Sequence, residues 1–118
     1  IPSFKVAEDD NHLAFLDIFP LVEGHVLVIP KKKTDYIFDI KSKDYMLLWV
    51  FAQKVAQGMK KVISCKRIGV SVIGLEVAHT HIHLIPINQV EDMNFSKSKL
   101  HFSDLEFHET AKKIRLAI

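Results

Sequence analysis

Three histidines close together are the residues of this sequence best suited to chemistry. His79, His81 and His83 alternate with Thr80 and with apolar residues. Successive side chains of a β-strand point to opposite faces, so the three imidazoles would line one face while the residues between them pack on the core. A polar face that arises by chance mixes lysine, glutamate, threonine and serine, so this row of imidazoles indicates a function.

A metal site is the first chemistry that such a row could support. Two histidines separated by one residue lie about 6.6 Å apart along a strand and can bind zinc together with a third ligand from elsewhere. The outer pair, His79 and His83, lies about 13 Å apart, which is too far for all three to reach one ion. A metal ion therefore accounts for only two of the three histidines.

Nucleophilic catalysis is the second possibility, and it uses all three histidines. A neutral imidazole nitrogen can attack an electrophile, most suitably phosphorus, while neighbouring imidazoles orient it and donate hydrogen bonds to phosphate oxygens. A P-loop is excluded as the source of phosphate binding. Leu75 and Glu76 follow Gly74, where a P-loop requires lysine and then serine or threonine.

The elements that must position these histidines can be predicted from apolar spacing and turn residues. The expected strands span residues 4–7, 13–18, 25–29, 68–73 and 80–87. A long helix is expected from Ser42, as its N-cap, to about Ile63, because apolar residues recur on one face. A final helix is expected at about 103–116, because Ser103 and Glu106 have the spacing of a capping box. We therefore predict an α+β fold, with helices covering one face of an antiparallel sheet.

The first half of the long helix differs from the second. Residues 45–51 are apolar nearly all round, whereas lysine and glutamine residues make the second half amphipathic. A helix that is apolar all round must bury a second face, which we expect to lie on another subunit.

Length and composition limit the class of protein. A chain of 118 residues fits one domain spanning residues 1–118, and the balance of 16 basic against 14 acidic residues is too even, and too scattered, for a nucleic-acid binder. Cys65 is the single cysteine, which excludes an internal disulfide and a Cys-x-x-Cys zinc site and favours a cytoplasmic location. The longest apolar run, residues 45–52, is far shorter than the roughly 20 residues of a membrane span.

Several segments together resemble a known family. Residues 79–85 resemble the signature of the histidine triad family, in its nucleotide-binding (Hint-like) branch. Residues 1–10, 14–20 and 24–32 are similar, in the same order, to successive blocks of that branch. The resemblance covers about residues 1–87 and implies a five-stranded antiparallel sheet, paired as a homodimer whose two sheets join.

The resemblance also implies a mechanism that needs no metal or other cofactor. His81 would attack the α-phosphorus of a nucleoside phosphoramidate, a dinucleoside polyphosphate or a related conjugate, forming a nucleotidyl-histidine that water then hydrolyses. His83 would contact phosphate oxygens, and His79 with His25 would hold the imidazoles in place. The expected partner is a purine nucleotide such as AMP or GMP.

The resemblance assigns further residues to the nucleotide. Asp17 is similar in position to a carboxylate that accepts hydrogen bonds from the ribose 2′ and 3′ hydroxyls, although an aspartate at a strand end also commonly caps a turn. Leu16, Ile18 and Ile1 match apolar positions that enclose the base, and ordinary core packing is the alternative. Ser71 stands where an asparagine is common and could bond the ribose or a phosphate.

Glu76 departs from the pattern of the family. Where many relatives have a Gly-Gln-Ser loop that donates hydrogen bonds to phosphate, this chain has Gly74, Leu75 and Glu76. A carboxylate repels phosphate, so Glu76 either points away, acts as a partly protonated acid, or indicates a different substrate. Two rivals to the enzyme therefore stay open: a nucleotide-binding regulatory module with little turnover and, less favoured, a zinc-dependent hydrolase.

Overall fold

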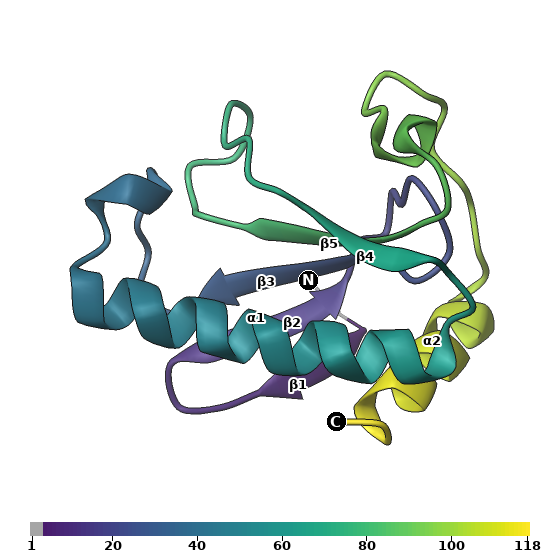
Figure 1. Ribbon diagram of the computed structural model, residues 1–118, viewed down its shortest axis with the longest axis horizontal. Helices are drawn as coiled ribbons and strands as arrows, with labels where there is room; N and C mark the ends of the chain where they lie inside the picture. The colour runs from purple at the N-terminus through teal and green to yellow at the C-terminus, as the bar shows by residue number, and fades with distance from the viewer. Residues whose placement is uncertain (1–3) are drawn as a thin grey trace.

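The computed structural model describes residues 4–118, and within them the strands form one five-stranded sheet (Figure 1). The strands are β1 (Lys5–Glu8), β2 (His12–Leu16), β3 (Val26–Pro30), β4 (Arg67–Ser71) and β5 (Ile82–Ile87). They lie in the order β1-β2-β3-β5-β4, and every neighbouring pair is antiparallel. The predicted α+β class and antiparallel sheet are confirmed.

The β1–β2 hairpin is closed by a local side-chain turn. The carboxylate of Asp9 accepts hydrogen bonds from the backbone N–H groups of Asn11 (2.8 Å) and His12 (2.7 Å). Such an Asx turn reverses the chain without help from distant residues, which explains why the hairpin could be predicted. The strand expected at 13–18 ends earlier, at Leu16, because the chain bends where Asp17 accepts a hydrogen bond from the backbone of Phe19.

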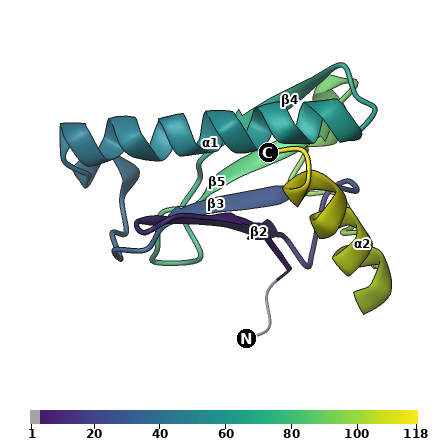
Figure 2. The ribbon, with the colours of Figure 1, turned by 90° about the horizontal axis from the view of Figure 1, so that it is seen from below.

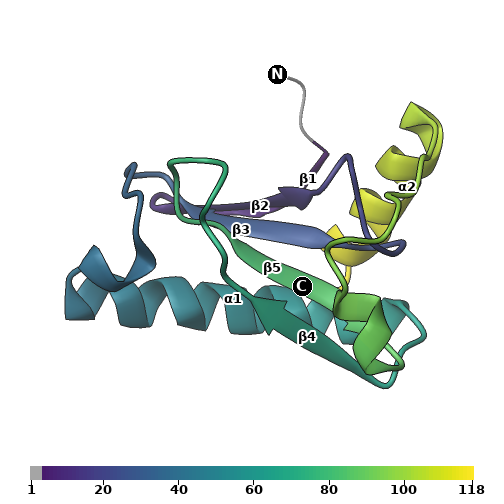
Figure 3. The same cartoon turned by 90° about the horizontal axis from the view of Figure 1, so that it is seen from above.

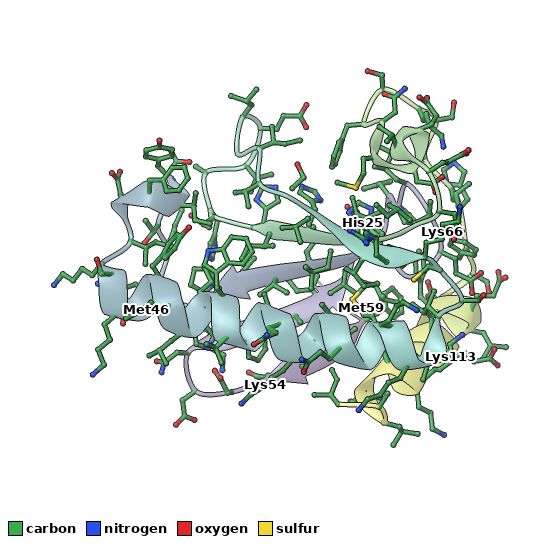
Figure 4. All side chains as sticks on the ribbon, viewed as in Figure 1. His25, Met46, Lys54, Met59, Lys66 and Lys113 are labelled. Atoms are coloured by element: carbon green, nitrogen blue, oxygen red, sulfur yellow. The ribbon has the colours of Figure 1, made fainter. Side chains whose placement is uncertain are left out.

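Helix α1 (Ser42–Val62) lies along one face of the sheet (Figure 2). Its buried stripe, which includes Leu48, Val55 and Met59, packs against the alternate residues of the strands that face it. Met59 points from α1 toward the sheet in Figure 4. The predicted helix is confirmed, but Ser42 is its first helical residue. Lys41 occupies the N-cap position without a side-chain hydrogen bond.

Helix α2 (Asp104–Arg115) packs against β1 and α1 (Figure 1). The hydroxyl of Ser103 accepts a hydrogen bond from the N–H of Glu106, whose carboxylate accepts one from the N–H of Ser103. The predicted capping box is therefore confirmed. Two short 3₁₀ helices, η1 (Ile37–Asp39) and η2 (Val90–Met93), were not predicted.

The face of the sheet opposite α1 carries the side chains that line a cleft. Strand alternation divides β3, for example, into Val26 and Val28, which pack in the core, and Leu27 and Ile29, which line the cleft. The connection from β4 to β5 leaves the sheet on this side, as Figure 3 shows. Within residues 4–118, no helix has both the length and the apolar character needed to cross a membrane.

Candidate active site

Of the three histidines predicted to form one row, one lies in a strand and two lie in the connection before it. His83 lies in β5, whereas His79 and His81 lie in the connection before it, because β5 begins at Ile82 rather than at the predicted Thr80. The rings of His81 and His83 still meet edge to face, with centroids 5.0 Å apart. All three side chains line one cleft of about 640 Å³.

Thr80 holds the start of this segment against a distant loop. Its backbone N–H and its hydroxyl each donate a hydrogen bond of 2.7 Å to the carbonyl oxygen of Thr34. The hydroxyl also lies 3.2 Å from the carbonyl oxygen of Asp35. Thr80 is 1% exposed, so the residue between His79 and His81 is fixed in the interior.

The protonation pattern of His81 follows from one contact. Its Nδ1 lies 2.8 Å from the carbonyl oxygen of His79. A carbonyl oxygen can only accept, so Nδ1 carries the proton and Nε2 keeps its lone pair. His79 is itself held by Pro30, whose carbonyl oxygen accepts a hydrogen bond of 2.7 Å from Nε2. The neutral ring of His81 therefore has the tautomer that a nucleophile requires, with the proton on Nδ1.

A second chain of hydrogen bonds fixes His25 and His83. The backbone N–H of Leu21 donates to Nδ1 of His25 at 3.1 Å, so the proton of His25 must lie on Nε2. That Nε2–H donates to Nδ1 of His83 at 2.9 Å, which leaves the proton of His83 on its own Nε2. His83 consequently offers a hydrogen-bond donor next to the lone pair of His81.

Both histidines of this chain are neutral near pH 7. The pKa of His25 is lowered to about 3, chiefly by burial, with smaller contributions from the positive charge that His83 would carry when protonated and from Lys99. Burial also lowers the pKa of His83 to about 4, with a further contribution from His81. His25, which is 2% exposed and labelled in Figure 4, would lose its acceptor role if it were protonated at Nδ1.

Asp17 lies beside these imidazoles. One carboxylate oxygen accepts a hydrogen bond of 2.8 Å from the N–H of Phe19, and the other lies 3.7 Å from Nε2 of His25. Burial raises the pKa of Asp17, while the Phe19 hydrogen bond and the charges of His81 and Lys99 oppose this effect. Asp17 therefore caps a turn and also lines the cleft, so the two interpretations made from the sequence are compatible.

Comparison with known proteins places the chain in a family. The family model of the HIT domain matches residues 1–90. The chain belongs to the HIT family. A crystal structure of a Hit-like protein from Bartonella henselae superimposes with a TM-score of 0.84 at 32% identity, covering 100% of this chain and 88% of that one.

Two curated relatives carry the names of enzymes. The chain is 38% identical over 87 residues to the adenosine 5′-monophosphoramidase HNT1 of Saccharomyces cerevisiae, covering 73% of this chain and 55% of that protein. It is 32% identical over 101 residues to the bis(5′-nucleosyl)-tetraphosphatase [asymmetrical] of Schizosaccharomyces pombe, covering 81% and 54%. The chain thus spans about half the length of each enzyme.

The apolar residues at one end of the cleft of this HIT chain differ by one position from those expected. Leu16 is 2% exposed and belongs to the hydrophobic core, so the structure does not bring it to the cleft. Phe15, on the opposite face of β2, lines the cleft instead. Ile18 is exposed and does not line the cleft, whereas its neighbour Phe19 does. Ile1 lies outside the described residues.

Ser71 and Glu76 differ in whether they line the cleft. Ser71 stands directly opposite His83 in the β4–β5 ladder, so both side chains share a face of the sheet, but Ser71 does not line the cleft. Glu76, in the connection from β4 to β5, borders the cleft together with His79 and His81. Of these two residues, only Glu76 is therefore part of the cleft lining.

Phe95 and Lys99 are further cleft residues of this HIT chain that were not found from the sequence. The ring of Phe95 meets that of His83 edge to face at 4.9 Å, and Lys99 also lines the cleft. Both belong to an irregular polar segment, which returns to the site because the N–H of Leu100 donates to the carbonyl oxygen of Pro20 at 2.9 Å. No local pattern in the sequence signals such a long-range return.

Three residues of the cleft region lie close enough together to act as ligands of one metal ion. Asp17, His25 and His83 each place one potential ligand atom within 4.8 Å of the other two, a set that differs from the two neighbouring histidines considered from the sequence. Binding through Nε2 of neutral His25 would move the proton to Nδ1, where it would face the N–H of Leu21. The N–H of Leu21 and a protonated Nδ1 of His25 would then be two donors facing each other. The arrangement therefore favours a proton between Nε2 of His25 and Nδ1 of His83.

Proposed function

We propose that this HIT chain is an enzyme that cleaves nucleotide conjugates at the α-phosphorus, with His81 as the nucleophile. The observation that carries the proposal is the hydrogen bond from Nδ1 of His81 to the carbonyl oxygen of His79, which leaves the Nε2 lone pair free. The phosphoramidase and tetraphosphatase names of the two curated relatives support the same class of reaction.

The reaction has two displacements. In the first, Nε2 of His81 forms a bond to phosphorus while the bond to the leaving group breaks and the leaving group takes up a proton. The N–H of His83 donates to a non-bridging phosphate oxygen, and the His79 carbonyl stabilises the positive charge that develops on the imidazole of His81. In the second, water attacks phosphorus, the P–N bond breaks, and a nucleoside monophosphate such as AMP or GMP leaves.

The rest of the cleft can bind the nucleoside. In this proposal Asp17 accepts hydrogen bonds from the ribose hydroxyls, and its location in the cleft lining supports that role. An apolar end of the cleft, formed in part by Phe15, Phe19 and Leu27, suits a flat base. In this proposal the site works without a metal ion, because the nucleophile and the donors are already in place.

One observation favours a rival, in which the chain binds nucleotides but turns over few of them. Glu76 borders the cleft, and its carboxylate would repel the phosphate that must approach His81. A regulatory module could retain the nucleoside pocket and tolerate this repulsion. The two proposals differ in turnover and not in nucleotide binding.

Turnover of a fluorogenic adenosine 5′-phosphoramidate by metal-stripped protein tests the proposal. We expect release of the amine by the unsubstituted chain and a loss of at least about 1,000-fold in His81→Ala, because the nucleophile is removed. His101→Ala, which changes an exposed histidine outside the cleft, serves as the control and should retain activity.

The other outcomes are equally informative. Undiminished turnover in His81→Ala would contradict the mechanism. No release by the unsubstituted chain, together with binding of AMP, would favour the regulatory module. Activity that appears only after zinc is added would favour a metal-dependent hydrolase.

We also infer that the chain forms a homodimer in the cytoplasm. Met46, which is 60% exposed, and Val50 form an apolar surface on α1, and β4 has one unpaired edge. A second copy could cover both, as the apolar first half of the helix predicts. The single cysteine, Cys65, supports the reducing compartment.

A further inference from the structure

Residues 94–100, which follow η2, return to the histidines of the cleft. The loop between β2 and β3 lies beside their end (Figure 1), where the N–H of Leu100 donates a hydrogen bond of 2.9 Å to the carbonyl oxygen of Pro20. Phe95 and Lys99 of this segment line the cleft. Neither side chain takes part in the two displacements described above.

The ring of Phe95 contacts both members of the His25–His83 pair. Its centroid lies 4.9 Å from that of His83 and 6.4 Å from that of His25, with the ring planes inclined by 74° and 78°. His25 is 2% exposed and His83 is 8% exposed, so little of either imidazole reaches solvent. Phe95 therefore forms part of the wall around the hydrogen bond that joins Nε2 of His25 to Nδ1 of His83.

A phenyl ring suits this position because it carries no nitrogen or oxygen that could bond an imidazole. A neutral imidazole has two tautomers, and the hydrogen-bond partner of one nitrogen decides which of them is present. Water can donate to Nδ1 of His83 or accept from it, so water admitted there would compete with His25 and permit either tautomer. An apolar neighbour excludes the water without competing for the nitrogen. His83 then keeps its proton on Nε2.

The backbone of Phe95 is held by the side chains of its own segment. The ammonium of Lys99 donates to the carbonyl oxygens of Phe95 (2.6 Å) and Lys97 (3.2 Å). The side-chain oxygen of Asn94 accepts a hydrogen bond of 2.9 Å from the N–H of Ser96. Hydrogen bonds from a charged donor are stronger than neutral ones, so Lys99 fixes Phe95 although the segment is irregular.

We propose that Phe95 is a positioning residue that shields the His25–His83 hydrogen bond from water, and that Lys99 holds it in place. The shielding keeps the Nε2–H of His83 available to a phosphate oxygen of the substrate. This last step rests on the function proposed above. Phe95 acts through His83 and not by contact with the reacting atoms.

Exchange of the Nε2 proton of His25 with water measures the shielding directly. NMR of protein that contains isotopically labelled histidine observes this proton, and its loss in His25→Asn identifies the signal. We expect exchange to be at least about tenfold faster in Phe95→Ala than in the unsubstituted chain at the same pH, because exchange requires access of water. Phe95→Leu keeps an apolar side chain and should exchange at nearly the unsubstituted rate.

Hydrolysis of an adenosine 5′-phosphoramidate measures the effect on the reaction. We expect kcat of Phe95→Ala to fall by about tenfold with little change in KM, because a less well fixed donor stabilises the transition state less. Phe95→Leu should recover most of this loss. Lys99→Met should lie between the two, since it frees the segment but leaves the ring.

Two controls make the same chemical changes elsewhere. Phe4→Ala removes a ring that meets His108 edge to face at 4.8 Å, outside the cleft. Lys97→Met removes an ammonium from the same segment, and Lys97 does not line the cleft. Both variants should keep the exchange rate and the kcat of the unsubstituted chain.

The outcomes separate this inference from the proposed function. Unchanged exchange in Phe95→Ala would overturn the shielding, whatever the turnover. Equally fast exchange in Phe4→Ala would indicate a general loosening of the fold and would also overturn it, as would a leucine variant no better than the alanine one. Faster exchange in Phe95→Ala alone, in a chain that hydrolyses no phosphoramidate, would overturn the proposed function and retain the shielding.

Discussion

Two buried histidines make the stability of this chain depend on pH. The pKa values of His25 and His83, about 3 and about 4 in the folded chain, lie below the value of about 6.5 in an unfolded chain. Between these values the unfolded chain binds more protons, so their contribution to stability is complete above about pH 6.5 and decreases as the pH falls toward 3. The raised pKa of Asp17 acts in the opposite direction and offsets part of this loss.

Urea unfolding at pH 7, 6, 5 and 4 measures this effect. We expect the unfolding midpoint to fall steadily over this range. His83→Asn, which removes one of the two imidazoles, should show a smaller fall than the unsubstituted chain. Equal midpoints at pH 7 and pH 4 would show that the histidines are not held neutral by burial.

At the residue scale, the sequence located the histidines better than the apolar residues of the cleft. The alternation of His79, His81 and His83 is unambiguous, because polar and apolar residues differ strongly. The run around Phe15 and Leu16 is nearly all apolar, so its two faces cannot be told apart by pattern. The resemblance pointed to Leu16, which the structure packs in the core, whereas Phe15 lines the cleft.

Thr80 connects the histidine segment to the rest of the fold. Thr80→Val keeps the shape but removes the hydroxyl that donates to Thr34. We expect a loss of about 1 kcal/mol in the free energy of unfolding. We also expect kcat to fall by about tenfold or more with little change in KM, because small displacements of a nucleophile slow the chemical step.

Thr110→Val is a matched control for this substitution. Thr110 is also buried, but it lies in α2, outside the cleft. Its variant should keep the kcat of the unsubstituted chain. If Thr80→Val unfolded at the same denaturant concentration as the unsubstituted chain and kept its kcat, Thr80 would not position the histidines.

At the scale of elements, features that depend on local contacts could be predicted from the sequence, and features that depend on distant contacts could not. The turn at Asp9 and the capping box at Ser103 close within three residues, so they could be predicted or explained from the sequence. The late start of β5, at Ile82 instead of Thr80, accompanies the hydrogen bond of Thr80 to a loop 46 residues away. Lys99 likewise reaches the cleft only through tertiary contacts.

At the scale of the whole molecule, the proposed homodimer would bury the exposed apolar surface of α1. The double variant Met46→Glu, Val50→Glu places two charges on that surface. We expect the unsubstituted chain to have the mass of a dimer in light scattering, and the double variant to have that of a monomer, because burying unpaired carboxylates is costly.

Lys54→Glu provides the control for charge on the same helix. Lys54 lies farther along α1 than Met46 (Figure 4) and belongs to its amphipathic half. This variant should remain a dimer. A monomeric mass for the unsubstituted chain would rule out the homodimer and leave the apolar surface without an occupant.

Main-chain atoms set the tautomers of His25, His79 and His81, namely the N–H of Leu21 and the carbonyl oxygens of Pro30 and His79. Every amino acid supplies a carbonyl, and every one except proline supplies an N–H. Substitution of Pro30 by any residue, or of Leu21 by any residue except proline, therefore keeps the main-chain group that contacts the histidine. The apolar lining of the cleft can therefore diversify around the same main-chain contacts, which makes the scaffold a favourable starting point for directed evolution toward new leaving groups.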